Sequence, residues 1–297
     1  MMRVAVLRNP AAGRGRHAQT VTAALAALAG PDRTVELLDA DSVDAARAAC
    51  AAAVDSGVDT LVAVGGDGTV HVGLQAVAGT GVGFGVIPAG TGNDFAAGVG
   101  LPVDPVAAAR LISEALTAGR TRAIDLGHIS GDDGFQRWFC AVLGAGFDAL
   151  VNERANAMRW PKGRRRYDFA IFAELIKLRP RRYRLTLDGE VIELDAVLVA
   201  VGNTPAYGGG MHMCPAADPT DGLLDVVVAG AISRSTLLRL QPKVYKGTHV
   251  NHPAVSSHRA RTVGIEADGI TAYADGERVC PLPITITTRP GALRLLG

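Results

Sequence analysis

Hydrophobic and polar residues alternate regularly over the first 120 residues of the chain. Short runs of consecutive apolar residues, typical of strands buried on both faces, are separated by longer segments with helical periodicity. The apolar runs lie at 3–7, 34–38, 59–64 and 83–87, and the helical segments at 20–28, 42–57, from 69 onward and at 104–118. This alternation predicts an α/β domain in which helices cover both faces of a parallel sheet.

The pattern changes after residue 122. From there on, strand-like segments follow one another with fewer helical segments between them. They lie at 137–143, 183–187, 191–201, 224–229, 262–266 and 284–288. We therefore expect a first domain at 1–122 and a second, mostly antiparallel and β-rich domain at 123–290.

Two glycine-rich segments directly follow predicted strands of the first domain, one at 65–69 and one at 88–95. Glycine lets the backbone approach a ligand without a Cβ in the way, and the helix that follows directs its N–H groups at an anion. Two such turns in one domain predict a site for the phosphates of a nucleotide. The alternative is a pair of ordinary strand-to-helix turns with Asp and Thr as helix caps.

Asp67 lies inside the first of these turns. A carboxylate at this position would repel phosphate oxygens unless a divalent cation lay between them. Mg²⁺ is usually held in this way, by one or two carboxylates together with phosphates and water. The turn therefore predicts Mg²⁺ beside the phosphates.

The composition excludes some classes of protein. A net charge of +1 argues against a dedicated nucleic-acid-binding protein, so we expect no nucleic-acid partner. The cysteines at 50, 140, 214 and 280 show no paired spacing. Neither a zinc site nor a disulfide framework is therefore indicated, and a reduced, cytoplasmic setting fits best.

Nothing in the hydrophobic pattern indicates a membrane span. The first apolar run, between Arg3 and Arg8, is too short for the core of a signal peptide. The long uncharged stretches 68–93 and 196–217 are interrupted by glycine, proline and polar residues, whereas a spanning helix needs about 20 predominantly apolar residues.

Taken together, the motifs resemble the diacylglycerol kinase catalytic-domain family of lipid kinases, which includes sphingosine kinases and bacterial soluble diacylglycerol kinases. The resemblance runs nearly from end to end. Its motifs are Asn9-Pro10 with Gly13 and Gly15, Gly65 to Thr69, Gly90 to Ala96, Asp125-Leu-Gly, Gly146-Phe-Asp148, Gly208 to Met211, Pro215 to Asp225 and Asp275-Gly-Glu277. Gly-Gly-Asp-Gly alone is shared with NAD kinases and phosphofructokinases, so the later motifs make the match specific.

The resemblance implies a fold like that of NAD kinase and diacylglycerol kinase, with ATP and Mg²⁺ as cofactors. In the family the final segment, here 291–297, returns to the first domain. Asp275 matches the aspartate that serves as general base toward the lipid hydroxyl. From the residues alone, Asp275-Gly276 predicts a hairpin turn, and a tight turn is compatible with a firmly held base.

The resemblance also assigns residues around the nucleotide. The candidates for nucleotide contact are Asn9, Gly65, Gly66, Asp67, Gly68, Thr69, Gly90, Thr91, Asn93 and Glu277. The carboxylates expected to hold catalytic Mg²⁺, partly through water, are Asp67, Asp94 and Asp125. Each of these three is also explained by helix capping or by its place at a strand end.

A second metal site is expected at the loop that contains Asp218, Asp221 and Leu223. One carboxylate and two backbone carbonyl groups there would supply the oxygen ligands that Mg²⁺ prefers. Bacterial soluble members of the family carry a structural Mg²⁺ at this position. The alternative is a simple turn that leads into the strand at 224–229.

Residues 144–149 fit a relaxed dinucleotide fingerprint, Gly-Ala-Gly-Phe-Asp-Ala. They fall in the antiparallel half of the chain and outside a βαβ unit, so a tight strand-to-helix turn is the better interpretation. The chain has no Walker lysine motif, and the nucleotide is therefore not held as in P-loop enzymes.

The sequence indicates less clearly which residues contact the lipid or a membrane. Residues 158–167 combine five cations with a Trp and a Tyr, a composition suited either to an anionic membrane surface or to a solvated loop. The segment 167–178 that follows is interpreted as a helix that packs on the sheet. We expect peripheral, transient contact with a membrane, and exposed sheet edges would allow a homodimer without specifying one.

The sequence thus indicates an ATP-dependent lipid kinase with diacylglycerol as acceptor. The alternatives are a kinase for a sphingoid or other long-chain alcohol, a small-metabolite kinase similar to NAD kinase, and a non-catalytic lipid or nucleotide sensor. The full set of carboxylates, Asp67, Asp94, Asp125 and Asp275, weighs against a sensor.

Overall fold

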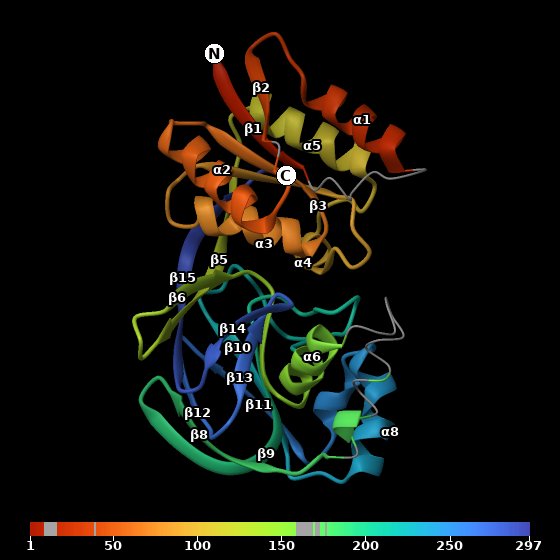
Figure 1. Ribbon diagram of the computed structural model, residues 1–297, viewed down its shortest axis with the longest axis vertical. Helices are drawn as coiled ribbons and strands as arrows, with labels where there is room; N and C mark the ends of the chain where they lie inside the picture. The colour runs from red at the N-terminus through yellow and green to blue at the C-terminus, as the bar shows by residue number, and fades with distance from the viewer. Residues whose placement is uncertain (9–16, 39, 159–168, 170–172, 176) are drawn as a thin grey trace. The chain divides into compact units, whose positions relative to one another are not determined.

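The computed structural model describes residues 1–297 except 9–16, 39, 159–168, 170–172 and 176 (Figure 1). The chain forms two compact units. The first contains 1–126, 219–221 and 289–297, and the second contains 127–218 and 222–288. The division differs from the expected one by a few residues at 122 and 290, and no sequence pattern indicated that 219–221 would group with the first unit.

The first unit contains a parallel sheet with strand order β15-β4-β3-β1-β2. Its strands are β1 (Met2–Arg8), β2 (Arg33–Leu38), β3 (Thr60–Gly65), β4 (Gly83–Pro88) and the end of β15 (Ile284–Leu295). Val6 of β1 pairs with Leu37 on one side and with Val62 on the other. The apolar runs thus form adjacent strands, as predicted.

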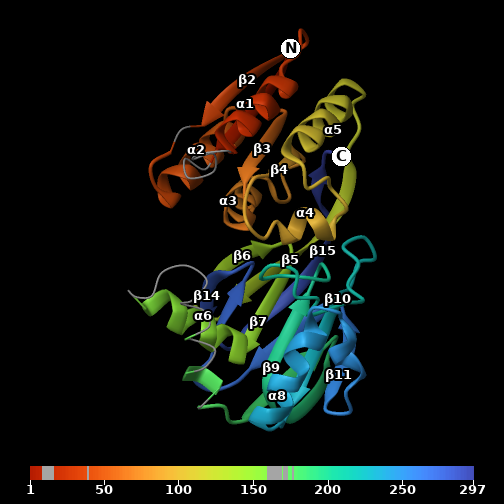
Figure 2. The same ribbon diagram turned by 90° about the vertical axis from the view of Figure 1, so that its right-hand side faces the viewer.

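Helices cover both faces of this sheet. They are α1 (His17–Leu28), α2 (Val43–Asp55), α3 (Asp67–Val77), α4 (Asp94–Gly98) and α5 (Pro105–Thr117). Helices α1 and α5 pack together on one face and α2 and α3 on the other, as Figure 2 shows. The prediction of an α/β domain with a parallel sheet is confirmed.

Local capping sets where two of these helices begin. Ser42 Oγ accepts a hydrogen bond from Ala45 N at 3.1 Å, so Ser42 caps α2 where the predicted helical segment at 42–57 begins. Asp104 Oδ1 accepts one from Ala107 N at 2.8 Å, ahead of α5. Helix α3 begins at Asp67 rather than after Thr69, because Gly66 takes the N-cap position with its extended backbone.

The second unit is β-rich and its strand pairs are antiparallel, as predicted. Its strands are β6 (Gln136–Phe139), β7 (Val142–Gly146), β8 (Arg181–Leu187), β9 (Glu190–Gly202), β10 (Leu224–Gly230), β11 (Val255–Ala260), β12 (Thr262–Glu266), β13 (Thr271–Ala274) and β14 (Glu277–Pro281), with parts of β5 (Arg122–Gly131) and β15. A large core of buried residues lies between the strands, with Tyr183, Val199 and Ile286 fully buried.

Helices α6 (Phe147–Ala157) and α8 (Arg234–Val244) and the 3₁₀ helix η1 (Thr248–Asn251) belong to this unit. Helix α6 packs on β7, β13 and β9. It begins directly after Gly146, which confirms the strand-to-helix turn at 144–149. Leu240 of α8 is buried in a second cluster with Val227 of β10.

Several of these elements were not predicted from the sequence. Strand β11 reads Val-Ser-Ser-His-Arg-Ala and, among the described strands, pairs only with β10, so it lacks the apolar alternation of a buried strand. Helix α8 contains Pro242, a residue that usually ends a helix. The single strand expected at 137–143 is two, β6 and β7, because the chain turns at Cys140 and Ala141.

Within the described residues, no helix is both long enough and apolar enough to cross a membrane.

Candidate functional site

The two glycine turns of the first unit lie in direct backbone contact. Strands β3 and β4 pair so that Gly65 is opposite Pro88, and Ala89 N donates to Gly65 O at 2.9 Å. A Cβ on Gly90 would lie 2.3 Å from Gly66 Cα. Because no Cβ fits at residue 90, glycine is required there by the packing of one turn against the other.

Asn93 fixes the shape of the second turn. Its backbone is left-handed, with φ of 57°. Its side chain accepts from Gly90 N at 3.0 Å and donates to Gly90 O at 3.1 Å. Thr91 is exposed beside it, whereas Thr69 is buried with its side chain over Gly65. The structure therefore places these predicted nucleotide residues on one pair of adjacent turns.

Asp67 connects the two turns through its side chain. Its Oδ1 accepts from Phe95 N at 3.3 Å, in the first turn of α4. Asp94 begins that helix and is only 7% exposed. Asp67 therefore lies at the start of α3, where a negative charge is favourable. Its hydrogen bond to Phe95 N also places it beside the residue that follows Asp94 in the chain.

Asp125 joins three separate segments of the first unit. Its Oδ1 accepts from Gly291 N at 2.8 Å, and its backbone N donates to Pro219 O at 2.7 Å. It is 4% exposed. Among the described residues, no three His, Cys, Asp or Glu side chains form a group that could hold a metal, so Asp67, Asp94 and Asp125 do not build a protein cage for an ion.

Asp275 lies at the hairpin turn between β13 and β14. Asp275 and Gly276 both have positive φ, of 52° and 82°, as a two-residue type I′ turn requires. Its carboxylate accepts from Cys140 N at 3.0 Å and from Ala141 N at 2.8 Å. The predicted turn is confirmed, and its half-buried carboxylate is oriented by the corner between β6 and β7.

Asn203, just after the end of β9, supports that corner from behind. Its Nδ2 donates to Cys140 O at 2.9 Å, and its backbone N donates to Ala141 O at 2.8 Å. The Cys140 carbonyl and the Ala141 N–H belong to one peptide group. A hydrogen-bond chain therefore runs from the Asn203 amide through this peptide to the Asp275 carboxylate, and such chains strengthen cooperatively. No motif in the sequence marks Asn203, which lies 72 residues from Asp275.

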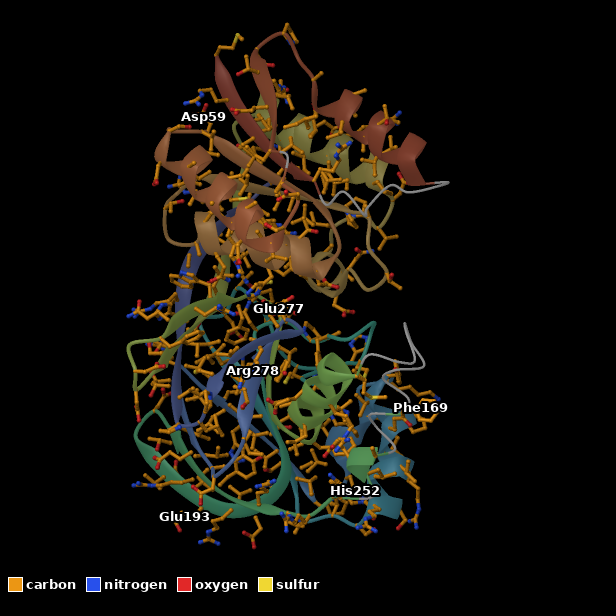
Figure 3. All side chains as sticks on the ribbon, viewed as in Figure 1. Asp59, Phe169, Glu193, His252, Glu277 and Arg278 are labelled. Carbon is orange, nitrogen blue, oxygen red and sulfur yellow. The ribbon has the colours of Figure 1, made fainter. Side chains whose placement is uncertain are left out.

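Glu277 and Arg278 follow the turn and are both exposed (Figure 3). Arg278 Nε lies 3.6 Å from Glu153 Oε1 of α6, so the hairpin is also tied to this helix. Asn9 and residues 159–167, predicted for nucleotide and membrane contact, lie outside the described residues.

The loop expected to hold a second metal leads into β10. Asp218, Asp221 and Leu223 are in this loop, and Asp225 follows them within the strand. Burial raises the pKa of Asp225 to about 6, and the negative charge of Asp218 contributes. Asp225 Oδ2 also lies 3.4 Å from Arg259 Nε. Asp225 ends the motif from Pro215 to Asp225, but the sequence patterns assigned no role to its carboxylate.

Comparisons with known proteins identify the class. Residues 3–129 match the diacylglycerol kinase catalytic domain, and residues 141–297 match the YegS C-terminal NAD kinase beta sandwich-like domain. The chain therefore belongs to the diacylglycerol kinase catalytic-domain family, and it is a kinase.

Individual relatives agree with this assignment. A diacylglycerol kinase of Mycobacterium tuberculosis is 49% identical over 298 residues, which cover 99% of this chain and 94% of the relative. A "probable lipid kinase YegS-like" of Stenotrophomonas maltophilia is 33% identical over 82% of this chain and 81% of its own. The crystal structure of a diacylglycerol kinase from Bacillus anthracis has the same fold, with a TM-score of 0.71 at 23% identity, covering 99% of this chain and 96% of that one.

Proposed function

We propose that this kinase transfers the γ-phosphate of ATP to the hydroxyl group of diacylglycerol, which gives phosphatidate and ADP. The geometry of Asp275 is the observation that most supports this proposal. Its carboxylate is oriented by the N–H groups of Cys140 and Ala141 on a tight turn, as a general base must be. In the reaction the acceptor oxygen bonds to the γ-phosphorus, the bond to the ADP oxygen breaks, and the hydroxyl proton passes to Asp275.

The glycine turns are the proposed phosphate site. Their backbone approaches a ligand without side chains, and the N-terminus of α3 begins beside them at Asp67. Thr69, Thr91 and Asn93 would contact the nucleotide from these turns, together with Asn9. Glu277, next to the proposed base, is the candidate for its sugar or base.

The residues present fit a Mg²⁺ ion held mainly by phosphates and water. Such an ion needs only one or two carboxylates from the protein, and the described residues offer no three-carboxylate cage. Asp67 would hold it, with Asp94 and Asp125 acting partly through water. When bound, the ion neutralises charge on the phosphates. Asp67 itself also links the two turns through Phe95 N.

A second Mg²⁺ is proposed at Asp218, Asp221 and the Leu223 carbonyl. The chemistry of the loop fits, because Asp218 and the buried Asp225 carry like charges close together. A divalent cation there would offset their repulsion. Its role would be structural, at the start of β10.

Diacylglycerol is proposed as acceptor because the relative with 49% identity over nearly the whole chain bears that name. A different long-chain lipid alcohol is the second candidate, since a relative at 33% identity is named only as a lipid kinase. Either acceptor would bring the enzyme into transient contact with a membrane surface. Formation of a homodimer through exposed sheet edges is also proposed.

The test is transfer of labelled γ-phosphate from ATP, with Mg²⁺, to diacylglycerol, monoacylglycerol, sphingosine, ceramide and NAD. Asp275→Asn is run in parallel, with Glu190→Gln as a control, because Glu190 is an exposed carboxylate that follows the similar Asp188-Gly189 turn. Loss of the general base should lower kcat about a hundred- to ten-thousandfold, while ATP still binds. Because an amide offers one acceptor to two N–H donors, thermal unfolding of the variant is measured as well.

Label on diacylglycerol that Asp275→Asn abolishes would support both the acceptor and the base. Label on sphingosine or another lipid would replace diacylglycerol, and label on NAD alone would refute the lipid proposal. Full activity in folded Asp275→Asn would refute the role of Asp275. Nucleotide binding without transfer to any acceptor would favour a sensor.

A further inference from the structure

Helix α8 has an outer face that the proposed chemistry does not use. The helix lies on the outside of the second unit, as Figure 2 shows. Its inner face is anchored by Leu240, which is buried in a cluster with Val227 and Val255. The opposite face is exposed, so its side chains are available to a partner.

Apolar side chains form a row on this outer face. Leu238 is 51% exposed and Tyr245 is 45% exposed, and Pro242 between them is exposed as well. Residues four and seven positions apart lie on one face of a helix, so these three are in line. Exposed apolar residues that gather on one surface, unlike those scattered singly, are typical of an interaction site.

Each residue of this row is followed by a cation. Arg239, Lys243 and Lys246 are exposed and form a second row beside the first. Arg234 adds another exposed charge in the first turn of the helix. In the described part of the chain, no carboxylate lies within ion-pair distance of these four side chains. The outer face of α8 is therefore both apolar and positively charged.

The sequence around α8 carries no negative charge. Between Asp225 and Glu266 there is no Asp or Glu, although the whole chain has 29 acidic residues. This stretch folds into one part of the second unit, because β10 pairs with β11, β11 contacts η1 and η1 contacts α8. The summed field of such a region attracts an anionic partner from a distance.

The apolar row indicates which anionic partner fits. A soluble polyanion such as a nucleic acid would neutralise the cations but leave Leu238 and Tyr245 against water, which is unfavourable. A bilayer with anionic lipids suits both rows, because its headgroups meet the cations and its acyl-chain boundary meets the apolar side chains. Tyrosine is enriched at this depth of a membrane, where its ring is apolar and its hydroxyl is wet.

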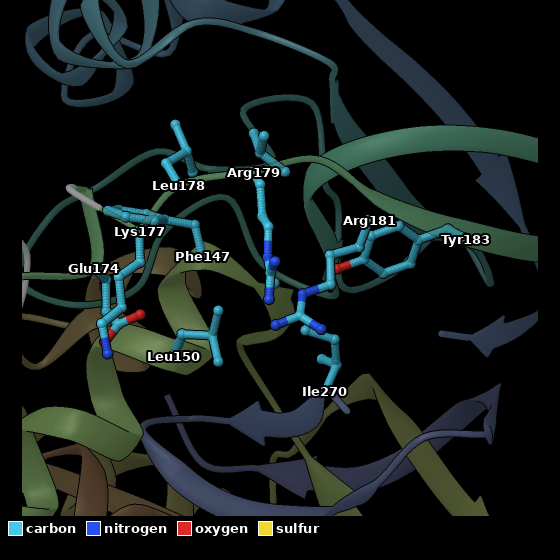
Figure 4. Close-up of a pocket in the computed structure, with 11 residues that line it drawn as sticks. Phe147, Leu150, Glu174, Lys177, Leu178, Arg179, Arg181, Tyr183 and Ile270 are labelled. Carbon is cyan, nitrogen blue, oxygen red and sulfur yellow. The ribbon is translucent and has the colours of Figure 1, made fainter. Parts of the chain in front are cut away.

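We propose that α8 is a membrane-docking surface, with Leu238 and Tyr245 inserted among the headgroups of an anionic bilayer and the four cations facing its phosphates. The proposal deepens the proposed function and rests on it, since a kinase for a membrane lipid must meet its acceptor at a bilayer. The surface is distinct from the pocket at the start of α6 in Figure 4, because none of the described residues that line this pocket belongs to α8. Substitutions on the outer face of α8 therefore leave the lining of the pocket unchanged.

The test is sedimentation of the whole protein with vesicles of phosphatidylglycerol and phosphatidylcholine, without nucleotide or diacylglycerol. Vesicles of phosphatidylcholine alone should bind much less protein, and added salt should release it from the anionic vesicles. Leu238→Ser and Tyr245→Ser should each lower the partition coefficient about tenfold through lost apolar contact. Lys243→Gln should lower it about fivefold, as expected for one cation near an anionic surface.

Two substitutions serve as matched controls. Val191→Ser removes an apolar side chain of β9 that is 46% exposed but lies in the chain between Glu190 and Glu193. Arg110→Gln removes an exposed arginine from α5 of the first unit. Neither should change vesicle binding. Because all the substituted residues are exposed, every variant should stay folded, and thermal unfolding checks this.

Several results would overturn the proposal. Unchanged binding of folded Leu238→Ser and Tyr245→Ser to anionic vesicles would place the membrane contact elsewhere. Equal binding to neutral vesicles, or equal weakening by Val191→Ser or Arg110→Gln, would also contradict it. Binding to soluble polyglutamate with the same dependence on Leu238 and Tyr245 would indicate an acidic protein partner instead.

The vesicle assay involves no phosphate transfer. Its outcome is therefore independent of the acceptor panel and of Asp275→Asn, and failure of the docking proposal can be told apart from failure of the proposed function.

Discussion

The glycine turns of the first unit and the Asp275 turn of the second unit are built on opposite principles. At the glycine turns, Gly66 and Gly90 approach so closely that no Cβ fits on Gly90, and the groups proposed to bind phosphate are backbone N–H groups. At the Asp275 turn, the proposed base is a side chain, and the backbone of Cys140 and Ala141 orients it.

This difference predicts different kinds of sensitivity. The glycine turns should be damaged by adding atoms, because their geometry depends on close approach of two backbone segments. The Asp275 turn should be damaged by removing polar atoms, because its geometry depends on a chain of hydrogen bonds that ends at Asn203. Three substitutions test this contrast.

Of these three substitutions, Gly90→Ala is expected to have the largest effect. The added methyl would lie 2.3 Å from Gly66 Cα and 2.9 Å from Gly66 N, so the two turns must separate. Overpacking of this kind costs about 1–3 kcal/mol, and we expect the KM for ATP to rise by at least about tenfold. Steady-state kinetics at varied ATP would measure it.

Gly57→Ala is the control for Gly90→Ala. Gly57 has φ of 79°, and no atom lies within 4 Å of the place that a Cβ would take, so alanine there has only a conformational cost. It should lose about 1 kcal/mol of stability and keep its KM for ATP. An unchanged KM in Gly90→Ala as well would show that phosphates do not bind at these turns.

An intermediate effect is expected for Asp67→Asn. Asparagine keeps the Oδ1 acceptor for Phe95 N, so the link between the turns survives while the charge is lost. If Asp67 holds Mg²⁺, the Mg²⁺ concentration for half-maximal rate should rise about tenfold or more. An unchanged Mg²⁺ requirement would mean that Asp67 serves only as a hydrogen-bond acceptor for Phe95 N at the start of α4. The proposed phosphate site at the glycine turns would then be built from backbone groups alone.

The smallest effect on the reaction is expected for Asn203→Ala. Loss of the donor to Cys140 O should lower kcat about tenfold by loosening the Ala141 peptide, and stability should fall by about 1–3 kcal/mol. The KM for ATP should not change, in contrast to Gly90→Ala. Rates at saturating acceptor and thermal unfolding would be compared.

Thr204→Val is the matched control for Asn203→Ala. Thr204 is equally buried, and its hydroxyl has no hydrogen-bond partner within the described residues. Valine has nearly the same shape, so both stability and kcat should be retained. If Asn203→Ala loses stability but keeps its kcat, Asn203 has only a structural role.

Most of the local structure could be predicted from sequence patterns. The buried strands of the first unit, the N-cap at Ser42 and the Asp275-Gly276 turn all depend on residues within a few positions of one another. Elements that violate the usual patterns were missed. Strand β11 is polar because it lies at an edge, and α8 contains a proline.

The strand-to-helix turns, the hairpin at Asp275 and the family follow from the amino-acid sequence, because these depend on glycine positions and short motifs. The groups that those turns meet follow from the three-dimensional fold. Asp275 meets the amides of Cys140 and Ala141, more than 130 residues earlier, and Asp125 meets Gly291 N, 166 residues later. Such contacts follow from how strands pair and in which register, and no local pattern encodes the register between distant strands.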